Sequence, residues 1–123
     1  MKIIGIDVGT TTVCGAVLDA DSGKLLRSIT LANDSALPAR PFERLQDPRR
    51  IFGICKQLYE ALLAEFPDAA AVGLTGQMHG ILYLDGKGEP LSPLYTWQDG
   101  RGERLFERGE TYAQALTRAT GCH

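Results

Sequence analysis

The first third of the chain alternates short apolar runs with turn-forming residues. Apolar runs cover residues 3–8, 13–18 and 25–31, and the segments between them contain Gly9 and Gly23. Runs of this length, bounded by glycine and by hydroxyl or acidic residues, are typical of strands joined by tight turns. The pattern predicts that the chain opens with a meander of three strands.

The spacing of the apolar positions becomes helical after a loop with two prolines, residues 32–46. Asp47-Pro48 predicts the helix start, because the aspartate accepts hydrogen bonds at the N-cap and proline suits the first helical position. Apolar residues then recur every three or four positions up to Phe66-Pro67-Asp68, where the helix is expected to end. Residues 69–75 predict a short buried strand.

The last third of the chain has weaker signals. The segments 81–84 and 90–95 flank the turn "DGKG" and predict a hairpin or a pair of extended segments. From Arg101 onward the pattern predicts helix, with a break at Gly109. A second helical piece is expected to start at a capping box of Thr111 and Gln114 and to end at the C-cap Gly121.

Length and charge narrow the possible functions. With 123 residues and a formal net charge of −2, the chain is one domain or part of one, without the basic stripe that nucleic acid requires. No apolar run approaches the roughly 20 residues of a membrane span. The N-terminus reaches Asp7 too early for a signal peptide.

The cysteines indicate a cytoplasmic protein. Cys14, Cys55 and Cys122 are odd in number and far apart, so we expect reduced structural thiols rather than a disulfide framework. The adjacent Cys122 and His123 at the chain end would make a poor zinc site.

The first turn has the composition of a phosphate-binding loop. Gly9 allows the backbone to approach a phosphate, and Thr10, Thr11 and Thr12 add hydroxyl donors. Asp7 would be repelled by phosphate, and its useful role is to hold Mg²⁺ through water. A polar hairpin turn is the alternative, but the position after the first strand favours the phosphate loop. A Walker loop is absent from the sequence.

Two further clusters suit a polyhydroxylated ligand, because they combine hydrogen-bonding groups with a flat apolar ring and contain no strong nucleophile. The first follows the fourth predicted strand, where ligands of such sheets bind. The alternative for each residue is a structural role in the core or in a loop. The candidate residues are Gln77, Met78 and His79 in "TGQMHG" and Trp97, Asp99 and Arg101 in "TWQDGR".

In this order, "GIDVGTTT", "GQMHG" and "WQDGR" resemble the FGGY carbohydrate kinases. The resemblance covers essentially the whole chain, but only the first part of a family member. "GQMHG" is similar to the xylulokinase branch, whereas "TWQDGR", "RLQDPRRI" and the closing "ATG" are similar to sedoheptulokinase. The β-β-β-α-β order, with the fourth strand parallel to the first, likewise resembles the α/β ribonuclease H-like half-domain of the actin and sugar-kinase ATPases.

The resemblance implies ATP and Mg²⁺ as cofactors and a ketose as substrate. It makes Asp7 an activity-critical, magnesium-linked carboxylate and assigns Gly9, Thr10 and Thr11 to the phosphates. Met78 and His79 match the sugar-contacting pair, and Trp97 lies where related kinases line the sugar pocket. Asp99 and Arg101 are carried over to the same pocket.

The resemblance also implies missing parts, since the family's general base and adenosine-binding domain lie further downstream. Glu103, Glu107 and Glu110 are expected on the solvated face of a helix, not as the base. We therefore expect residues 1–123 to be the N-terminal portion of the first kinase domain, inactive alone. Apolar surface left uncovered would favour self-association into a homodimer.

The expected parent protein is an ATP-dependent ketose kinase that phosphorylates a hydroxyl of sedoheptulose or xylulose. A polyol kinase of the glycerol type and a non-catalytic sugar-binding module are the alternatives. "GQMHG" argues against the polyol branch, which has a charged pair at this position.

Overall fold

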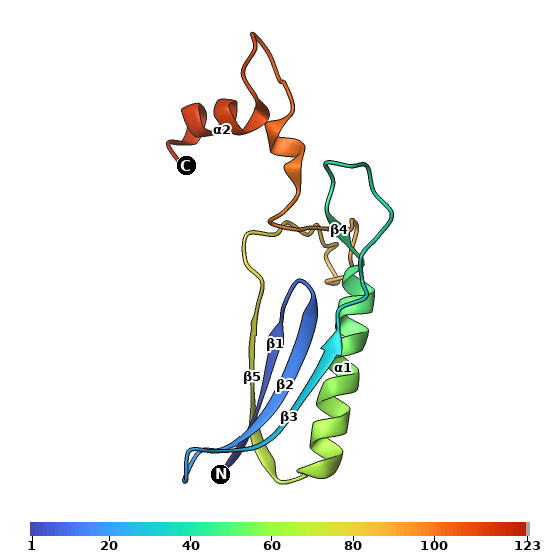
Figure 1. Ribbon diagram of the computed structural model, residues 1–123, viewed down its shortest axis with the longest axis vertical. Coiled ribbons are helices and arrows are strands. Elements are labelled where there is room, and N and C mark those ends of the chain that lie inside the picture. The colour runs from blue at the N-terminus through green and yellow to red at the C-terminus, as the bar shows by residue number, and fades with distance from the viewer. Residues whose placement is uncertain (123) are drawn as a thin grey trace.

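The chain forms a four-stranded sheet with one long helix packed on it, followed by a region of loops and short elements (Figure 1). The structure, a computed structural model, describes residues 1–122. Its elements in chain order are β1 (Lys2–Val8), β2 (Thr12–Asp19), β3 (Lys24–Ala32), β4 (Leu45–Gln46), α1 (Pro48–Glu65), β5 (Ala69–Gly76), β6 (Leu94–Tyr95), the 3₁₀ helix η1 (Gly100–Glu103) and α2 (Tyr112–Thr120).

The sheet has the predicted topology. Its strand order is β3-β2-β1-β5, with β1–β2 and β2–β3 antiparallel and β1–β5 parallel. The three-strand meander, the helix and the return of the fourth strand beside the first are all confirmed. The predicted burial of the fourth strand is wrong, because β5 lies at the edge of the sheet and its Val72 and Leu74 are 48% and 74% exposed. The α/β, ribonuclease H-like order expected from the sequence is therefore present in the described residues.

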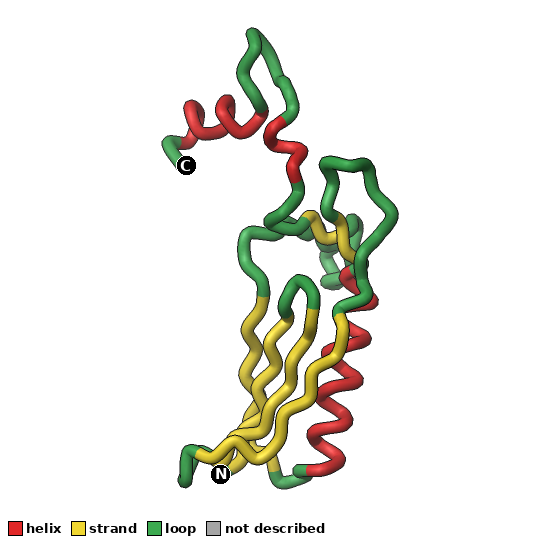
Figure 2. Tube along the Cα trace, in the orientation of Figure 1, coloured by secondary structure: helices red, strands yellow, loops and turns green. Residues whose placement is uncertain are grey.

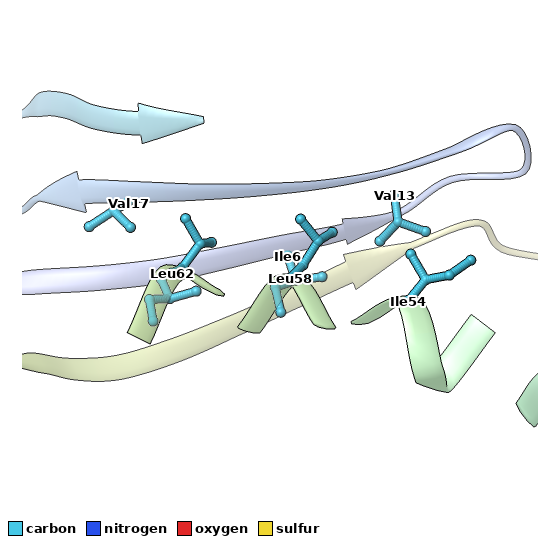
Figure 3. Packing of buried hydrophobic residues seen from close by; sticks show 7 residues of the cluster. Ile6, Val13, Val17, Ile54, Leu58 and Leu62 are labelled. Carbon is cyan, nitrogen blue, oxygen red and sulfur yellow. The ribbon is translucent and has the colours of Figure 1, made fainter. Parts of the chain in front are cut away.

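One side of α1 and one face of the sheet form the core (Figure 3). Asp47 caps the helix, and its carboxylate accepts from the Arg49 amide at 2.9 Å. The helix ends at Phe66, as predicted. Gly15 of β2 permits this close packing, since a Cβ there would lie 2.8 Å from Leu62 Cδ1. The buried apolar residues are Ile4, Ile6, Val13, Val17, Ile54, Leu58 and Leu62.

The sheet brings two chain segments together at one edge. Because β1 and β5 run in parallel, the turn after β1 and the loop after β5 leave the sheet at the same end. The Gln77 amide donates to the Val8 carbonyl at 2.8 Å, which extends the pairing past the strand ends. The phosphate-loop candidate and the first sugar-site candidate are thereby neighbours.

Of the two helical pieces predicted from Arg101 onward, the first is largely wrong, whereas the break at Gly109 and the second piece are confirmed. Helical structure here consists of the single turn η1 and of α2, with a loop between them (Figure 2). Arg108 and Gly109 have φ values of 53° and 82°, which no right-handed helix accommodates. Glu107 and Glu110 consequently lie in the loop, so the predicted charged helix face does not exist.

The extended segments before η1 pair more widely than predicted. Isolated bridges join Ile81 to Tyr95 and Leu84 to Pro90, which confirms an irregular hairpin around the "DGKG" turn. In addition, β6 pairs with β4, at the end of the loop that precedes α1. No sequence pattern predicts β4, whose two residues look like ordinary loop.

Two further predictions can be compared with the described residues. No helix within residues 1–122 is long and apolar enough to cross a membrane. Cys14, Cys55 and Cys122 are free thiols, as expected. His123 lies outside the described residues, so the pairing of Cys122 with it is not addressed.

Candidate functional site

In the turn between β1 and β2, the backbone carbonyls accept hydrogen bonds from the protein, whereas backbone amides are left free to donate to a ligand. Asn33 donates from its side chain to the Gly9 carbonyl and from its backbone to the Thr11 carbonyl, both at 2.8 Å. Gln46 Nε2 donates to the Thr10 carbonyl at 2.8 Å. Among residues 1–122, the backbone amides of Thr10 and Thr11 donate to no acceptor. Such a turn suits an anion, because free amides make a concave donor surface.

Gly9 is required by the tightness of this turn. A Cβ at this position would lie 2.8 Å from the Thr12 carbonyl oxygen, closer than real Cβ atoms come. The hydroxyls of Thr11 and Thr12 belong to exposed residues beside the free amides. The described geometry is therefore compatible with the predicted phosphate loop.

Asn33 and Gln46 support the candidate phosphate loop, and neither was among the residues predicted from the sequence. They are 9% and 5% exposed, and their amides are used entirely inside the protein. Buried amides need partners, and here those partners are the carbonyls of the turn. In the sequence both look like polar loop residues, so only the three-dimensional pairing identifies them.

The two sugar-site motifs meet at Thr10. The Thr10 hydroxyl donates to Gln77 Oε1 at 2.9 Å and accepts from the Trp97 indole N–H at 3.1 Å. Gln77 Nε2 donates in turn to Gln46 Oε1 at 2.8 Å. Gln77 and Trp97 are therefore bonded to Thr10 at the centre of the first turn, although they lie 67 and 87 positions away from it along the chain.

A pocket of about 410 Å³ opens beside this junction. It combines hydrogen-bonding groups with aromatic faces, and Trp97 is 57% exposed there. Tyr83 and Tyr95 pack edge to face, with ring centroids 6.3 Å apart. The lining contains four of the predicted sugar residues, His79, Trp97, Asp99 and Arg101, and adds Ile81, Tyr83, Tyr95, Thr96, Gly102 and Leu116.

His79 enters this pocket from a strained backbone. Its φ of 60° lies in the left-handed region, which non-glycine residues adopt at a cost. The next residue, Gly80, is closely packed, because a Cβ at this position would lie 3.1 Å from Leu94 Cδ1 and 3.2 Å from the Tyr95 carbonyl oxygen. Strain of this kind is concentrated at ligand sites, which favours the binding interpretation of His79.

Asp99 and Arg101 line the pocket, but their polar atoms are mostly used within the protein. The Asp99 side chain is 5% exposed and accepts from the backbone amides of Arg44 and Arg101 and from the Arg101 guanidinium, at 2.6 to 3.2 Å. Burial alone would raise the pKa of Asp99, but these hydrogen bonds outweigh it and lower the pKa. The guanidinium also stacks on the Tyr95 ring at 4.3 Å. This pair is built to hold the pocket wall.

Met78 and Asp7 lie outside this pocket. Met78 is 71% exposed and is not part of the lining. Asp7 is exposed on the sheet face opposite α1, in register with Cys14 and Thr75, and borders a groove of about 420 Å³. Within residues 1–122, no group of three or more His, Cys, Asp or Glu is placed to hold a metal. Asp7 therefore offers one carboxylate, which fits an ion held mainly by water and phosphate.

The fold is that of a sugar kinase. A xylulose kinase from Lactobacillus acidophilus superposes with a TM-score of 0.78 at 25% identity, over 98% of this chain and 23% of that one. A glycerol kinase from Plasmodium falciparum superposes with a TM-score of 0.74, and at 19% identity it bears on the fold alone. The model of the FGGY family of carbohydrate kinases, N-terminal domain, matches residues 2–122. The chain belongs to this family.

Individual relatives include two kinds of ketose kinase. The xylulose kinase of Streptomyces rubiginosus is 34% identical in an alignment that covers 85% of this chain and 22% of the relative. The sedoheptulokinase of Mus musculus is 36% identical in an alignment that covers 84% of this chain and 27% of the relative. The chain thus spans about a quarter of the length of these enzymes.

Proposed function

We propose that the protein carrying this chain is an ATP-dependent ketose kinase, which transfers the γ-phosphoryl group of MgATP to a hydroxyl of a sugar such as sedoheptulose or xylulose. The observation that carries the proposal is the junction at Thr10, where residues of both sugar-site motifs bond to the phosphate-loop candidate. A kinase needs its acceptor and its phosphoryl donor side by side, because transfer depends on positioning.

The phosphate side of the site consists of Gly9, Thr10, Thr11 and Thr12. The free amides and the exposed hydroxyls of this turn would bind phosphate oxygens. Asp7, on the strand that delivers the turn, would hold Mg²⁺ through water. When bound, the ion neutralises charge on the transferring phosphoryl group.

The sugar side of the site is the pocket beside Trp97. Its exposed indole face suits the C–H face of a sugar, and His79 offers hydrogen bonds to hydroxyls. Gln77 would act indirectly, through its hydrogen bond with Thr10. The ion pair of Asp99 and Arg101 would hold the pocket wall in place. Met78 would contact the sugar from outside the described pocket. The uncharged "GQMHG" favours a ketose over a polyol.

Residues 1–123 would be the N-terminal portion of the first kinase domain, with the general base and the adenosine site supplied by other residues of the longer protein. Glu110 is bonded to Arg118 at 2.7 Å, and Glu103 lies on η1, which makes neither a candidate base. The chain alone is proposed to be inactive. A cytoplasmic location and a homodimer stay predictions.

The test is an ADP-release assay on the full-length protein, with sedoheptulose, D-xylulose, L-ribulose and glycerol in parallel. Ketose turnover is expected. Asp7→Ala should reduce kcat by at least about 100-fold through the lost magnesium contact, and His79→Ala should raise the KM for the sugar. Glu60→Ala, on the exposed side of α1, is the control.

The other outcomes of this assay have definite meanings. Turnover of glycerol alone would assign the protein to the polyol branch. Sugar binding without turnover of any acceptor would make it a sugar-binding protein on a kinase fold. Full activity of Asp7→Ala would remove the proposed role of this carboxylate.

A further inference from the structure

The hydrogen bonds around Thr10 form a chain in which the donor and the acceptor of every bond are assigned. At one end the Thr10 carbonyl can only accept, so the Gln46 atom 2.8 Å from it is the amide nitrogen. The Gln46 oxygen must then accept from Gln77, whose own oxygen is left to accept from the Thr10 hydroxyl. At the other end the Trp97 indole can only donate, and it does so to the same hydroxyl.

This chain determines what Thr10 can offer to a nucleotide. A hydroxyl has one proton, and the proton of Thr10 is used for Gln77. Its contribution to phosphate binding therefore comes from the backbone amide, which has no protein acceptor within residues 1–122. The Thr10 carbonyl that Gln46 holds lies in the same peptide plane as the Thr11 amide, which also has no protein acceptor within residues 1–122, so Gln46 orients that amide.

Gln46 is the buried residue in this series of hydrogen bonds. It is 5% exposed, comes from β4, and bonds to two other segments of the protein, the turn after β1 and the loop after β5. Gln46 does not line the pocket beside Trp97, although it lines a separate hollow of about 570 Å³ together with Thr10 and Thr11. Its hydrogen bonds reach the sugar pocket only through Gln77 and Thr10.

We propose that Gln46 is a positioning residue which couples the sugar pocket to the phosphate loop through Gln77, Thr10 and Trp97. A sugar packed on the Trp97 ring restricts the indole, which orders the Thr10 hydroxyl and with it the turn that binds phosphate. Binding linkage is reciprocal, so nucleotide must improve sugar affinity by the same factor. This inference rests on the proposed sugar and nucleotide sites but not on catalytic turnover.

The test measures the dissociation constant of D-xylulose and of sedoheptulose by calorimetry on the full-length protein, with and without the Mg²⁺ complex of a non-hydrolysable ATP analogue. The ratio of the two constants is the coupling. For the unmodified protein we expect a ratio of about 5 or more.

Two substitutions each remove a different hydrogen bond of the series around Thr10. Thr10→Val removes the hydroxyl at nearly constant volume, and Gln46→Glu removes the donor to the Thr10 carbonyl. Both should reduce the ratio to about 1, since each interrupts the linkage. Thr10→Ser keeps the hydroxyl and should retain the coupling. Gln57→Glu introduces the same new charge on the exposed side of α1, away from these hydrogen bonds, and is the matched control.

A purely structural role of Gln46 would weaken both ligands equally and leave the ratio unchanged, which would overturn the inference. A ratio of 1 in the unmodified protein would also overturn it. If a ketose binds with coupling but is not phosphorylated, the inference stands and the proposed kinase activity fails. If no ketose binds, both fail.

Discussion

The sheet with α1 and the segment after β5 are stabilised in different ways. In the first region, Ile4, Val13, Val17 and Leu62 are 0% exposed, packed between α1 and the sheet. In the second region, residues 77–122, Met78, Trp97, Leu105 and Leu116 are 57–73% exposed. Leu74 of β5 is 74% exposed as well, so the regions differ in that none of the buried apolar residues lies in the second one. Its order comes from hydrogen bonds, bridges and caps.

This difference explains how the chain can provide both a scaffold and a binding surface. Apolar groups that pack against one another are unavailable to a ligand, whereas Trp97 is anchored through its indole N–H and remains 57% exposed. Polar anchoring therefore preserves the apolar surface of the pocket. The three predictions that follow probe the scaffold first and the pocket region afterwards.

Truncation in the core should have the largest effect on stability. Leu58 is 1% exposed and packs against β2, where a Cβ on Gly15 would lie 3.6 Å from its Cδ2. Leu58→Ala should lower the free energy of unfolding by about 2–5 kcal/mol, because it removes buried methyl groups and leaves a cavity. Urea unfolding measures this loss.

Phe52 provides the matched control on the same helix. It is 71% exposed, so Phe52→Ala should change the free energy of unfolding by no more than about 0.5 kcal/mol. Equal losses for the two substitutions would contradict the division between a buried and an exposed side of α1.

The scaffold was predictable because its signals are local and repeated. Alternation in β1 and β2, the Asp47-Pro48 start and the helical spacing to Leu62 all report burial against one core, and the strand and helix bounds follow within about one residue. Even in the second region the capping box of Thr111 and Gln114 and the positive φ of Gly121 are as expected, since caps are also local.

The site was predictable only in its composition. The motifs containing Gln77 and Trp97 could be recognised from residue types, but their meeting at Thr10 depends on the parallel placement of β5 beside β1 and on the paired loops beyond it. Gln46 lies in a two-residue strand that has no sequence signal. The first helical piece expected after Arg101 ends after the single turn η1, because Arg104 is already extended at φ −70° and ψ 147°, which its residue type does not indicate.

In the pocket region, Asp99 should have the largest effect and a distinctive pH dependence. Asp99→Asn weakens the hydrogen bonds to Arg101 and Arg44, and we expect a loss of about 1–3 kcal/mol at pH 7. The pKa of Asp99 is lowered by folding, so its contribution is complete above the unfolded value of about 4 and disappears as the pH falls through the folded pKa.

The measurement for Asp99 is thermal or urea unfolding of both proteins between pH 2 and pH 7. Other carboxylates with lowered pKa, such as Asp34 and Asp68, titrate in the same range, and the difference between the two proteins removes their effect. The two stability curves should converge at acid pH. A difference that stays constant down to pH 2 would mean that the charge of Asp99 plays no part.

The smallest global effect should come from the cap of α2. Thr111 accepts from the Gln114 amide at 3.2 Å and its own amide donates to Gln114 Oε1 at 2.8 Å, a reciprocal pair worth about 1 kcal/mol. Because α2 has no buried residues, its unfolding is separable from that of the core. Thr111→Ala should therefore speed hydrogen exchange of the α2 amides about fivefold while exchange in β1 stays unchanged.

Thr111→Ser, which keeps the hydroxyl acceptor of the cap, is the control for this prediction. Faster exchange in β1 would show that the two regions unfold together, and the contrast between scaffold and pocket region would then be one of surface exposure rather than of stability.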